Sequence, residues 1–329
     1  MSELTIPGLS DVLAARKRIA PYLEPTPLYR YPALDALTGA RLWVKHENHQ
    51  PIGAFKVRGG INLISQLSPG DRSRGVISAS TGNHGQSVAY AASVFDVHAV
   101  ICVPEQANPV KVESMRALGA EVIFHGRDFD EAREHCEKLA AERGYRYIHS
   151  ANEPALIAGV ATYTLEILEA QPDTEVIVVP VGGGSGLAGA SIVASAVSPS
   201  IEVIGVQSEA APAAQLSWRA RALVEDSTAT IAEGLATRTA FELTQRIMWS
   251  LVDDFVLVSE SDLVQATRLM IEKTRNLVEP AGAVSLAAVL AAPGRFTDRT
   301  VAIVCSGGNI SPDQLVSLWP RSAERDLRP

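Results

Sequence analysis

Short apolar runs rich in β-branched residues recur along the chain, and longer stretches with helical spacing separate them. Bounded by glycine or proline, the apolar runs predict strands at Leu42–Val44, Val76–Ser78, His98–Val103, Glu121–Phe124, Tyr145–Ile148, Glu175–Val179, Glu202–Val206, Phe255–Val258 and Val301–Val304. The intervening stretches predict helices at Asn83–Val94, Pro109–Leu118, Asp128–Arg143, Pro154–Glu169, Leu187–Ala196, Ser261–Arg275 and Ala281–Leu290. Continuous apolar strands that alternate with helices indicate an α/β fold around a parallel sheet buried on both faces.

The spacing of these elements also predicts how the chain is divided. The four strands between Val76 and Ile148 alternate closely with helices, and we expect them to form a smaller sheet inserted into a larger one. Asp128 and the segment Glu260–Asp262 carry ordinary signals for the start of a helix. A chain of 329 residues is long enough for two domains.

Composition narrows the class of protein. The chain is 47% hydrophobic and 20% charged, which excludes disorder of the whole chain. Its net charge of −8 argues against nucleic acid as the main partner, because phosphate neutralisation needs a basic surface. No apolar run approaches the roughly 18 residues of a membrane span, and the N-terminus lacks a signal-peptide pattern. We therefore expect a soluble cytoplasmic protein, in which Cys102, Cys136 and Cys305 form neither a disulfide framework nor a zinc site.

The segment Gly53–Gly60 places Lys56 at the start of a predicted helix whose next turns are apolar. Most lysines in such a position are solvated surface residues, and this remains the alternative interpretation. Desolvation by apolar neighbours such as Phe55 would lower the pKa of the amine and allow it to act as a nucleophile or base. The nearby His46 and His49 lack the spacing of helical metal ligands, so a metal site there is disfavoured.

Three further segments at the ends of predicted strands favour ligand binding. In Ser78–Gln86, hydroxyl residues, glycine and asparagine precede a helix, a composition typical of capping and equally of a carboxylate site. In Gly182–Gly189, four glycines within five positions predict a phosphate site, with a purely structural turn as the alternative. The same segment fits a dinucleotide-binding pattern, which alone is weak. Val301–Asn309 ends at the sheet edge where ligands bind in open α/β sheets, and Cys305 within it is expected to be a buried apolar residue.

Together and in this order, the four segments resemble the fold type II pyridoxal-phosphate enzymes, specifically the threonine/serine dehydratase and serine racemase group. The resemblance extends from about Pro25 to Asn309. Gly53–Gly59 is similar to the family's lysine motif, with Ala54 in place of a serine, and Ser80–Gly85 is similar to its asparagine loop. Its tetraglycine phosphate loop matches Gly182–Gly186, with Ser185 in place of the last glycine, and Ser306–Asn309 matches the segment beside the pyridine nitrogen.

The resemblance implies a larger open twisted sheet with a smaller inserted α/β domain, and pyridoxal 5′-phosphate bound between them. On this basis we expect residues 1–50 and 151–320 to form the large cofactor-binding domain and residues 70–150 a small mobile domain. Residues 321–329 would be a C-terminal tail, and Lys56 would lie near the junction of the domains. Family analogy further implies a homodimer.

The resemblance also assigns roles to individual residues. Lys56 would hold the cofactor as an imine and then act as the base at the substrate Cα. Phe55 would pack beside the cofactor ring, Asn83 would hydrogen-bond the ring hydroxyl, and Ser306 would lie against the pyridine nitrogen. The N–H groups that would hold the phosphate belong to Gly182, Gly183, Gly184, Ser185 and Gly186. The substrate would contact Ser80, Thr81, Gly82, His84 and Glu279.

These roles imply β-elimination, in which a β-hydroxy amino acid loses water and ammonia to give a 2-oxo acid. Threonine and serine are the default substrates, while 3-hydroxyaspartate, a β-aryl serine or an ectoine-pathway hydroxy amino acid remain open. An amino-acid racemase or a β-replacement synthase is the alternative on the same scaffold. A module that binds a dinucleotide without chemistry would leave Lys56 and Asn83 unexplained.

Two departures from the family pattern affect these expectations. Thr81 stands where the racemase has the serine that acts on the second face of the substrate, and its extra methyl group and restricted rotamer disfavour that role. Relatives that a divalent ion activates bind it with carboxylates at the positions of Gln207 and Ala213, so we expect no such metal site here. Glu209 is close enough in sequence to rebuild one.

Overall fold

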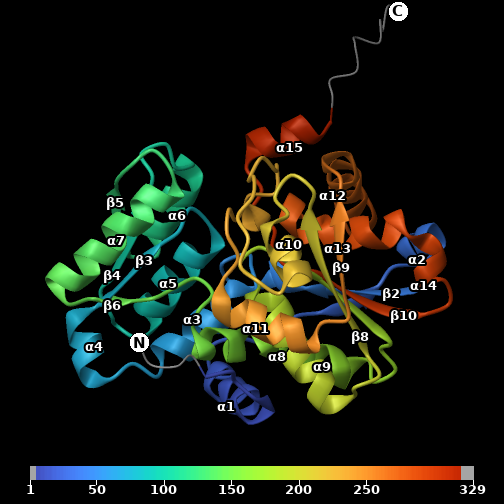
Figure 1. Ribbon diagram of the computed structural model, residues 1–329, viewed down its shortest axis with the longest axis horizontal. Coiled ribbons are helices and arrows are strands. Elements are labelled where there is room, and N and C mark those ends of the chain that lie inside the picture. Colours follow the sequence, from blue (N-terminus) through green and yellow to red (C-terminus); the bar gives the residue numbers. More distant parts are fainter. Residues whose placement is uncertain (1–4, 320–329) are drawn as a thin grey trace, which may run out of the picture.

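The apolar runs form strands in two separate sheets within residues 5–319, the part of the chain that the computed structural model describes (Figure 1). The larger sheet has the order β1 (Leu28–Arg30), β2 (Arg41–His46), β10 (Thr300–Cys305), β7 (Val176–Pro180), β8 (Glu202–Ser208) and β9 (Asp254–Val258). The smaller sheet has the order β5 (Glu121–Phe124), β4 (Ala99–Val103), β3 (Val76–Ala79) and β6 (Arg146–Tyr147). The expected smaller sheet, inserted between strands of the larger one, is therefore confirmed.

One strand that the sequence pattern did not predict, β1, lies at an edge of the larger sheet. β1 runs antiparallel to β2 and pairs Leu28 with Lys45, whereas the other described strand pairs of both sheets are parallel. β1 is a short edge strand whose side chains are partly or fully exposed. It therefore lacks the two-sided burial from which a parallel strand is predicted.

Alternating residues of the central strands face two hydrophobic cores. Ile177 and Val179 of β7 lie in one core, and Val176 and Val178 lie in the other. The first core is covered by α1 (Leu9–Ile19), α8 (Pro154–Ala170), α9 (Ser185–Val197) and α11 (Glu242–Leu251). The second is covered by α2 (Pro32–Thr38), α12 (Glu260–Thr274) and α13 (Pro280–Ala291). Burial on both faces explains why these strands are apolar at successive positions.

Helices also cover the smaller sheet. On one side α7 (Phe129–Arg143) contributes Cys136 to a core that includes Val100 of β4. The other side is covered by α5 (Asn83–Val94) and α6 (Pro109–Ala117), and α4 (Pro69–Arg74) leads into β3. Asp128 caps α7 as predicted, because its carboxylate accepts a hydrogen bond from the Glu131 N–H at 3.0 Å. α12 begins earlier than predicted, because Ser259 caps it.

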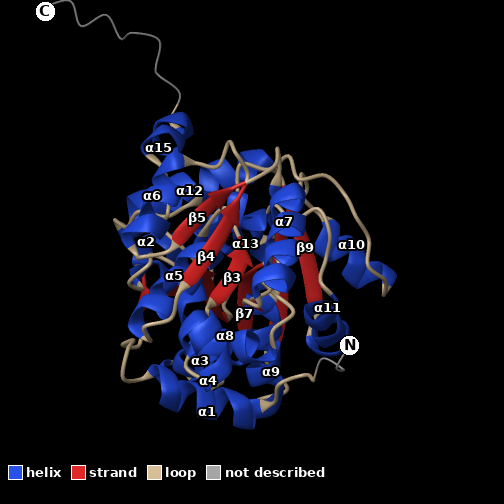
Figure 2. Ribbon diagram, turned by 90° about the vertical axis from the view of Figure 1, so that its left-hand side faces the viewer, coloured by secondary structure: helices blue, strands red, loops and turns tan. Residues whose placement is uncertain are grey.

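Several elements were not predicted from the sequence pattern, and they lie mainly at the periphery. They are β1, α1, α2, α4, α11, α10 (Ala213–Ala220), α14 (Pro293–Phe296), α15 (Pro312–Leu318), η1 (Glu47–His49) and η2 (Glu233–Leu235). In the turned view, strands lie inside and helices outside (Figure 2). No helix within the described residues is long and apolar enough to cross a bilayer. The expected tail at 321–329 lies outside the described residues.

Candidate active site

Hydrogen bonds join the four motif segments, which are far apart in the sequence. The Lys56 Nζ donates to Ser185 Oγ at 2.9 Å, and the Phe55 N–H donates to the carbonyl of Ser306 at 3.1 Å. The Asn309 Nδ2 donates to Asn83 Oδ1 at 2.7 Å. Three of the segments follow the carboxyl ends of β3, β7 and β10, the edge at which open α/β sheets bind ligands.

Lys56 begins α3 (Lys56–Ile64), which packs between α5 and α8 where the two sheets meet. Besides its bond to Ser185, the Nζ atom donates to the carbonyl of Ser150 at 3.3 Å and lies 5.4 Å from the centre of the Phe55 ring. Burial lowers the pKa of Lys56 to about 8. A substantial fraction of this amine is therefore neutral near pH 8 and can act as a nucleophile or base.

The glycine loop joins β7 to α9, which begins at Ser185, two residues before the predicted start. A Cβ atom at Gly182 would lie 2.2 Å from the Gly234 carbonyl oxygen, so only glycine fits there. Gly184 has a φ of +88°, and its Cβ would lie 3.0 Å from the Thr244 side chain. The loop therefore presents backbone rather than side chains at the positive end of α9, which fits a phosphate group.

Two aromatic rings stand beside this loop. The rings of Phe55 and Tyr163 meet edge to face with their centres 6.3 Å apart. The Tyr163 hydroxyl donates to the Gly186 carbonyl at 2.8 Å, and a Cβ at Gly186 would lie 3.5 Å from the Phe55 ring. Phe55 is thus held next to both the predicted phosphate loop and the Lys56 amine.

The asparagine loop links β3 to α5 and uses one of its predicted substrate ligands for capping. The Ser80 hydroxyl accepts hydrogen bonds from the N–H groups of Gly85 at 2.9 Å and Gly82 at 3.2 Å. The His84 Nε2 lies 3.0 Å from the hydroxyl of Ser78, and burial lowers the pKa of His84 to about 3, so the imidazole is neutral. The loop is more open at Thr81 and Gly82, which are only partly buried. Within 4 Å, a Cβ at Gly82 would meet only the Lys111 Nζ, at 3.9 Å.

Ser306 and Glu279 complete the site from the larger sheet. Ser306 is buried, and its hydroxyl lies 3.3 Å from the Ala281 carbonyl. Glu279 accepts a hydrogen bond from Asn83 Nδ2 at 2.7 Å, and its Oε1 would lie 2.1 Å from a Cβ at Gly307. Burial raises the pKa of Glu279, although the neighbouring Lys111 opposes the shift. Asn83 and Glu279, predicted from separate motifs, are therefore direct partners.

Sequence reasoning did not single out four residues that the structure places at these loops. Ser150 and Lys111 contribute a carbonyl next to Lys56 and an ammonium near Gly82. The Thr244 hydroxyl donates to the Gly183 carbonyl at 2.9 Å, and Asn309 contacts Asn83. Asn309 closes a motif and could have been found there, but Thr244 lies in α11, which the pattern did not predict. Lys111 forms an ion pair with Glu233 of η2, a contact between the two sheet units that no motif predicts.

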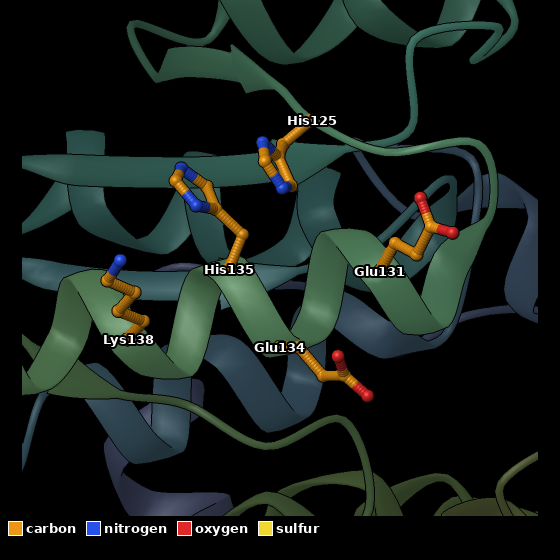
Figure 3. Close-up of a pocket in the computed structure, with 5 residues that line it drawn as sticks. All are labelled: His125, Glu131, Glu134, His135 and Lys138. Carbon is orange, nitrogen blue, oxygen red and sulfur yellow. The ribbon is translucent and has the colours of Figure 1, made fainter.

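A pocket on α7 of the smaller sheet unit contains none of these residues (Figure 3). His125, Glu131, Glu134, His135 and Lys138 line it. The imidazole rings of His125 and His135 stack with their centres 3.9 Å apart. Within residues 5–319, no group of three or more His, Cys, Asp or Glu side chains is arranged to hold a metal ion.

Comparison with known proteins gives a consistent result. Residues 19–307 match the sequence profile of the family described as pyridoxal-phosphate dependent enzyme. The chain is 39% identical to the L-threonine ammonia-lyase of Thermotoga maritima over 93% of this chain and 77% of that protein. It is 35% identical to the L-threo-3-hydroxyaspartate ammonia-lyase of Saccharomyces cerevisiae, over 96% of this chain and 97% of that protein. The structure of maize serine racemase superposes with a TM-score of 0.90 at 32% identity, covering 95% of this chain and 97% of that one.

Proposed function

This chain belongs to the pyridoxal-phosphate-dependent enzyme family, and on that premise we propose that it removes water and ammonia from a β-hydroxy amino acid, with L-threonine or L-serine as the substrate. The fold type II resemblance is confirmed by the match to serine racemase over nearly the whole chain. The observation that carries the proposal is the Lys56 amine, which has a pKa of about 8 and donates hydrogen bonds to Ser185 of the glycine loop and to the Ser150 carbonyl. Relatives named as ammonia-lyases for threonine and for 3-hydroxyaspartate support this reaction class.

The residues present fit pyridoxal 5′-phosphate, which supplies the electron sink for negative charge at the substrate Cα. The backbone of Gly182–Gly186 and the start of α9 would hold the phosphate. Asn83 would donate an N–H to the ring oxygen, Phe55 would pack beside the ring, and the Ser306 hydroxyl would face the ring nitrogen. At Gly182 the Gly234 carbonyl leaves no room for a Cβ atom, so this part of the loop consists of backbone alone, which supports the placement of the phosphate.

Lys56 is proposed as the residue that moves the proton. Its Nζ would take the proton from the substrate Cα, while Ser185 Oγ and the Ser150 carbonyl keep the amine near the site. The loop Ser80–His84 would bind the substrate carboxylate through N–H groups at the start of α5 and through the Ser80 hydroxyl, which accepts hydrogen bonds from Gly82 and Gly85 and keeps its own hydrogen to donate. Thr81 and Gly82 lie at the more open side of this loop, and Glu279 orients Asn83 beneath it.

A panel assay tests the proposed function directly. We expect the purified holoenzyme to form a 2-oxo acid and ammonia from L-threonine or L-serine faster than from 3-hydroxyaspartate or a β-aryl serine. Coupled detection of the 2-oxo acid, with ammonia measured in parallel, gives the rates. Turnover confined to 3-hydroxyaspartate would reassign the substrate, and the absence of any 2-oxo acid with the panel would contradict the proposal.

Racemisation is the alternative that the maize serine racemase supports. We propose that it is slow relative to elimination here, because Thr81 carries a methyl group and a restricted rotamer at the position proposed for the second-face proton. Chiral chromatography of the products measures both rates in one reaction. Formation of D-amino acid as fast as 2-oxo acid would move the assignment to a racemase.

Replacing Ser306 with aspartate is expected to slow β-elimination by about tenfold or more. A carboxylate at this buried position would favour a protonated ring nitrogen, which stabilises the negative charge at Cα instead of expelling the β-hydroxyl. Elimination and Cα–H exchange are measured together, and exchange should be retained. Ser311→Asp is the matched control, because Ser311 caps α15 and aspartate caps equally well. If Ser306→Asp changes neither rate, Ser306 does not face the ring.

Removal of divalent ions is expected to leave turnover unchanged within about twofold. Gln207 is buried in β8 and accepts a hydrogen bond from the Gln215 N–H at 3.1 Å, and Ala213 begins α10. Neither residue offers the carboxylate that a hard cation requires. Dialysis against a chelator followed by the 2-oxo acid assay tests this. Loss of activity that magnesium or calcium restores would show that Glu209 and nearby carbonyls have rebuilt a site.

We further propose that the smaller sheet and its helices, residues 70–150, act as a small domain that closes over the site, and that residues 1–50 and 151–320 form the large domain. The family resemblance supports this division and a homodimer. Gel filtration with light scattering tests the dimer. The net charge of −8 does not favour nucleic acid as a partner.

A further inference from the structure

Asn309 lies just beyond β10, and its side chain joins two other segments of the site. The Asn309 Nδ2 donates one hydrogen bond to the carbonyl of Ile52 at 2.8 Å and another to Asn83 Oδ1 at 2.7 Å. Its Oδ1 faces Gly53, where a Cβ would lie only 2.7 Å away. Gly53 has a φ of +67° and leads directly into the lysine motif. One side chain therefore connects the loop before Lys56 with the asparagine loop.

The chemistry of these partners fixes which way each amide points. The Ile52 carbonyl can only accept a hydrogen bond, so it must face the Nδ2 of Asn309 and not its Oδ1. The second hydrogen of that Nδ2 is directed at Asn83 and must meet an acceptor, which is Asn83 Oδ1. The orientation of Asn83 thus follows from a backbone carbonyl, through Asn309.

Glu279 holds Asn83 from the other side. Asn83 Nδ2 donates to Glu279 Oε1 at 2.7 Å, which is the direction that remains once Asn83 Oδ1 accepts from Asn309. An amide nitrogen carries two hydrogens, and this bond uses one of them. The second N–H of Asn83 remains available for a ring oxygen of the cofactor, provided that the Oδ1 stays turned toward Asn309.

We propose that Asn309 is a positioning residue that orients the Asn83 amide so that it presents an N–H, and not an oxygen, to the cofactor ring. The inference rests on the proposed function only in that Asn83 is taken to face the ring oxygen. It adds a residue from the larger sheet that governs a contact made by the smaller sheet unit, since Asn83 begins α5.

Asn309→Asp is the informative variant. A carboxylate at this position repels the Ile52 carbonyl and prefers a donor from Asn83, which reverses the Asn83 amide and turns its oxygen toward the ring. We expect the dissociation constant of the cofactor to rise about 10-fold. The absorbance maximum of the bound cofactor and its dependence on pH should shift, because the ring oxygen loses a donor. Fluorescence titration of the apo-protein and visible absorbance spectra measure these effects without reference to turnover.

A double-mutant cycle separates orientation of Asn83 from a general structural role of Asn309. In an Asn83→Ala background, Asn309→Asp should change the cofactor dissociation constant by less than about twofold, because the group it acts through is gone. Asn309→Ala, which removes the orientation without reversing it, should have a smaller effect than Asn309→Asp. Asn108→Asp is the matched control, since Asn108 caps α6 by accepting from the Val110 N–H and aspartate caps equally well. Thermal melting of every variant verifies the fold.

Three outcomes overturn the inference, and each is distinct from failure of the proposed reaction. Additive effects of the two substitutions would show that Asn309 acts on the cofactor independently of Asn83. An Asn83→Ala spectrum identical to that of the unmodified protein would show that Asn83 does not face the ring. An unchanged dissociation constant and spectrum in folded Asn309→Asp would show that the Asn83 amide is oriented by Glu279 alone. None of these measurements depends on which amino acid is turned over.

Discussion

Replacing Lys56 with alanine is expected to lower turnover by at least about 10³-fold and to abolish covalent attachment of the cofactor. Lys56 is the one lysine that contacts both Ser185 of the glycine loop and the Ser150 carbonyl within the described residues. Its amine has a pKa of about 8, so it combines a reactive neutral form with a position beside the predicted phosphate loop. The protein should fold normally, because the loss of a partly buried ammonium removes a desolvated charge.

Borohydride reduction followed by peptide mass spectrometry locates the attached cofactor, and the 2-oxo acid assay measures turnover. Lys138→Ala is the control, because the Lys138 side chain is 70% exposed and lies 3.8 Å from Glu142. Cofactor uptake by the apo-protein should also fall as the pH drops below about 8, since only the neutral amine reacts. Reduced cofactor found on another lysine in Lys56→Ala would show that Lys56 is not the attachment point.

Replacing Arg58 with methionine is expected to lower the free energy of unfolding by about 3–5 kcal/mol. Arg58 is buried two residues after Lys56 and donates to Glu47 at 2.7 and 2.9 Å. It also donates to Glu166 at 2.6 and 2.8 Å, and Lys45 donates to the same carboxylate at 2.5 Å. Removing the guanidinium leaves the buried Glu47 carboxylate without its paired charge, which is the costly case for a buried ion pair.

Chemical denaturation gives the free energy of unfolding for this series. Arg58→Lys should be intermediate, because lysine keeps the charge but not the two-pronged geometry. Arg16→Met is the matched control: the Arg16–Glu169 pair is about half exposed, and its loss should cost no more than about 1 kcal/mol. Because Arg58 anchors α3, any Arg58→Met protein that still folds should attach the cofactor more slowly at Lys56. A loss below 1 kcal/mol in Arg58→Met would contradict the buried network.

Local sequence determined most elements and the motifs at their ends. Apolar runs with two-sided burial predicted the central strands, such as β7 and β10, because burial on both faces leaves a signal at every position. The glycine loop was predicted from its composition, and the structure adds that no side chain fits at Gly182. The pattern of apolar residues did not predict elements that are buried on one face only or are exposed. β1, at the exposed edge, was missed and proved antiparallel, and the amphipathic α11 was not predicted.

Only the tertiary structure decided which of these loops are in contact and which of their atoms form hydrogen bonds with one another. The strand order places the ends of β7 and β10 side by side, where Lys56 contacts Ser185 and Phe55 contacts Ser306, and no local pattern encodes that order. It also shows a contact that no motif predicted: the Ser80 hydroxyl accepts hydrogen bonds from the N–H groups of Gly82 and Gly85. The orientation of Asn83 depends on Asn309 and Glu279, both about 200 residues away in the sequence. Sequence periodicity reports the burial of each residue, whereas hydrogen-bond direction depends on partners that only folding brings within 3 Å.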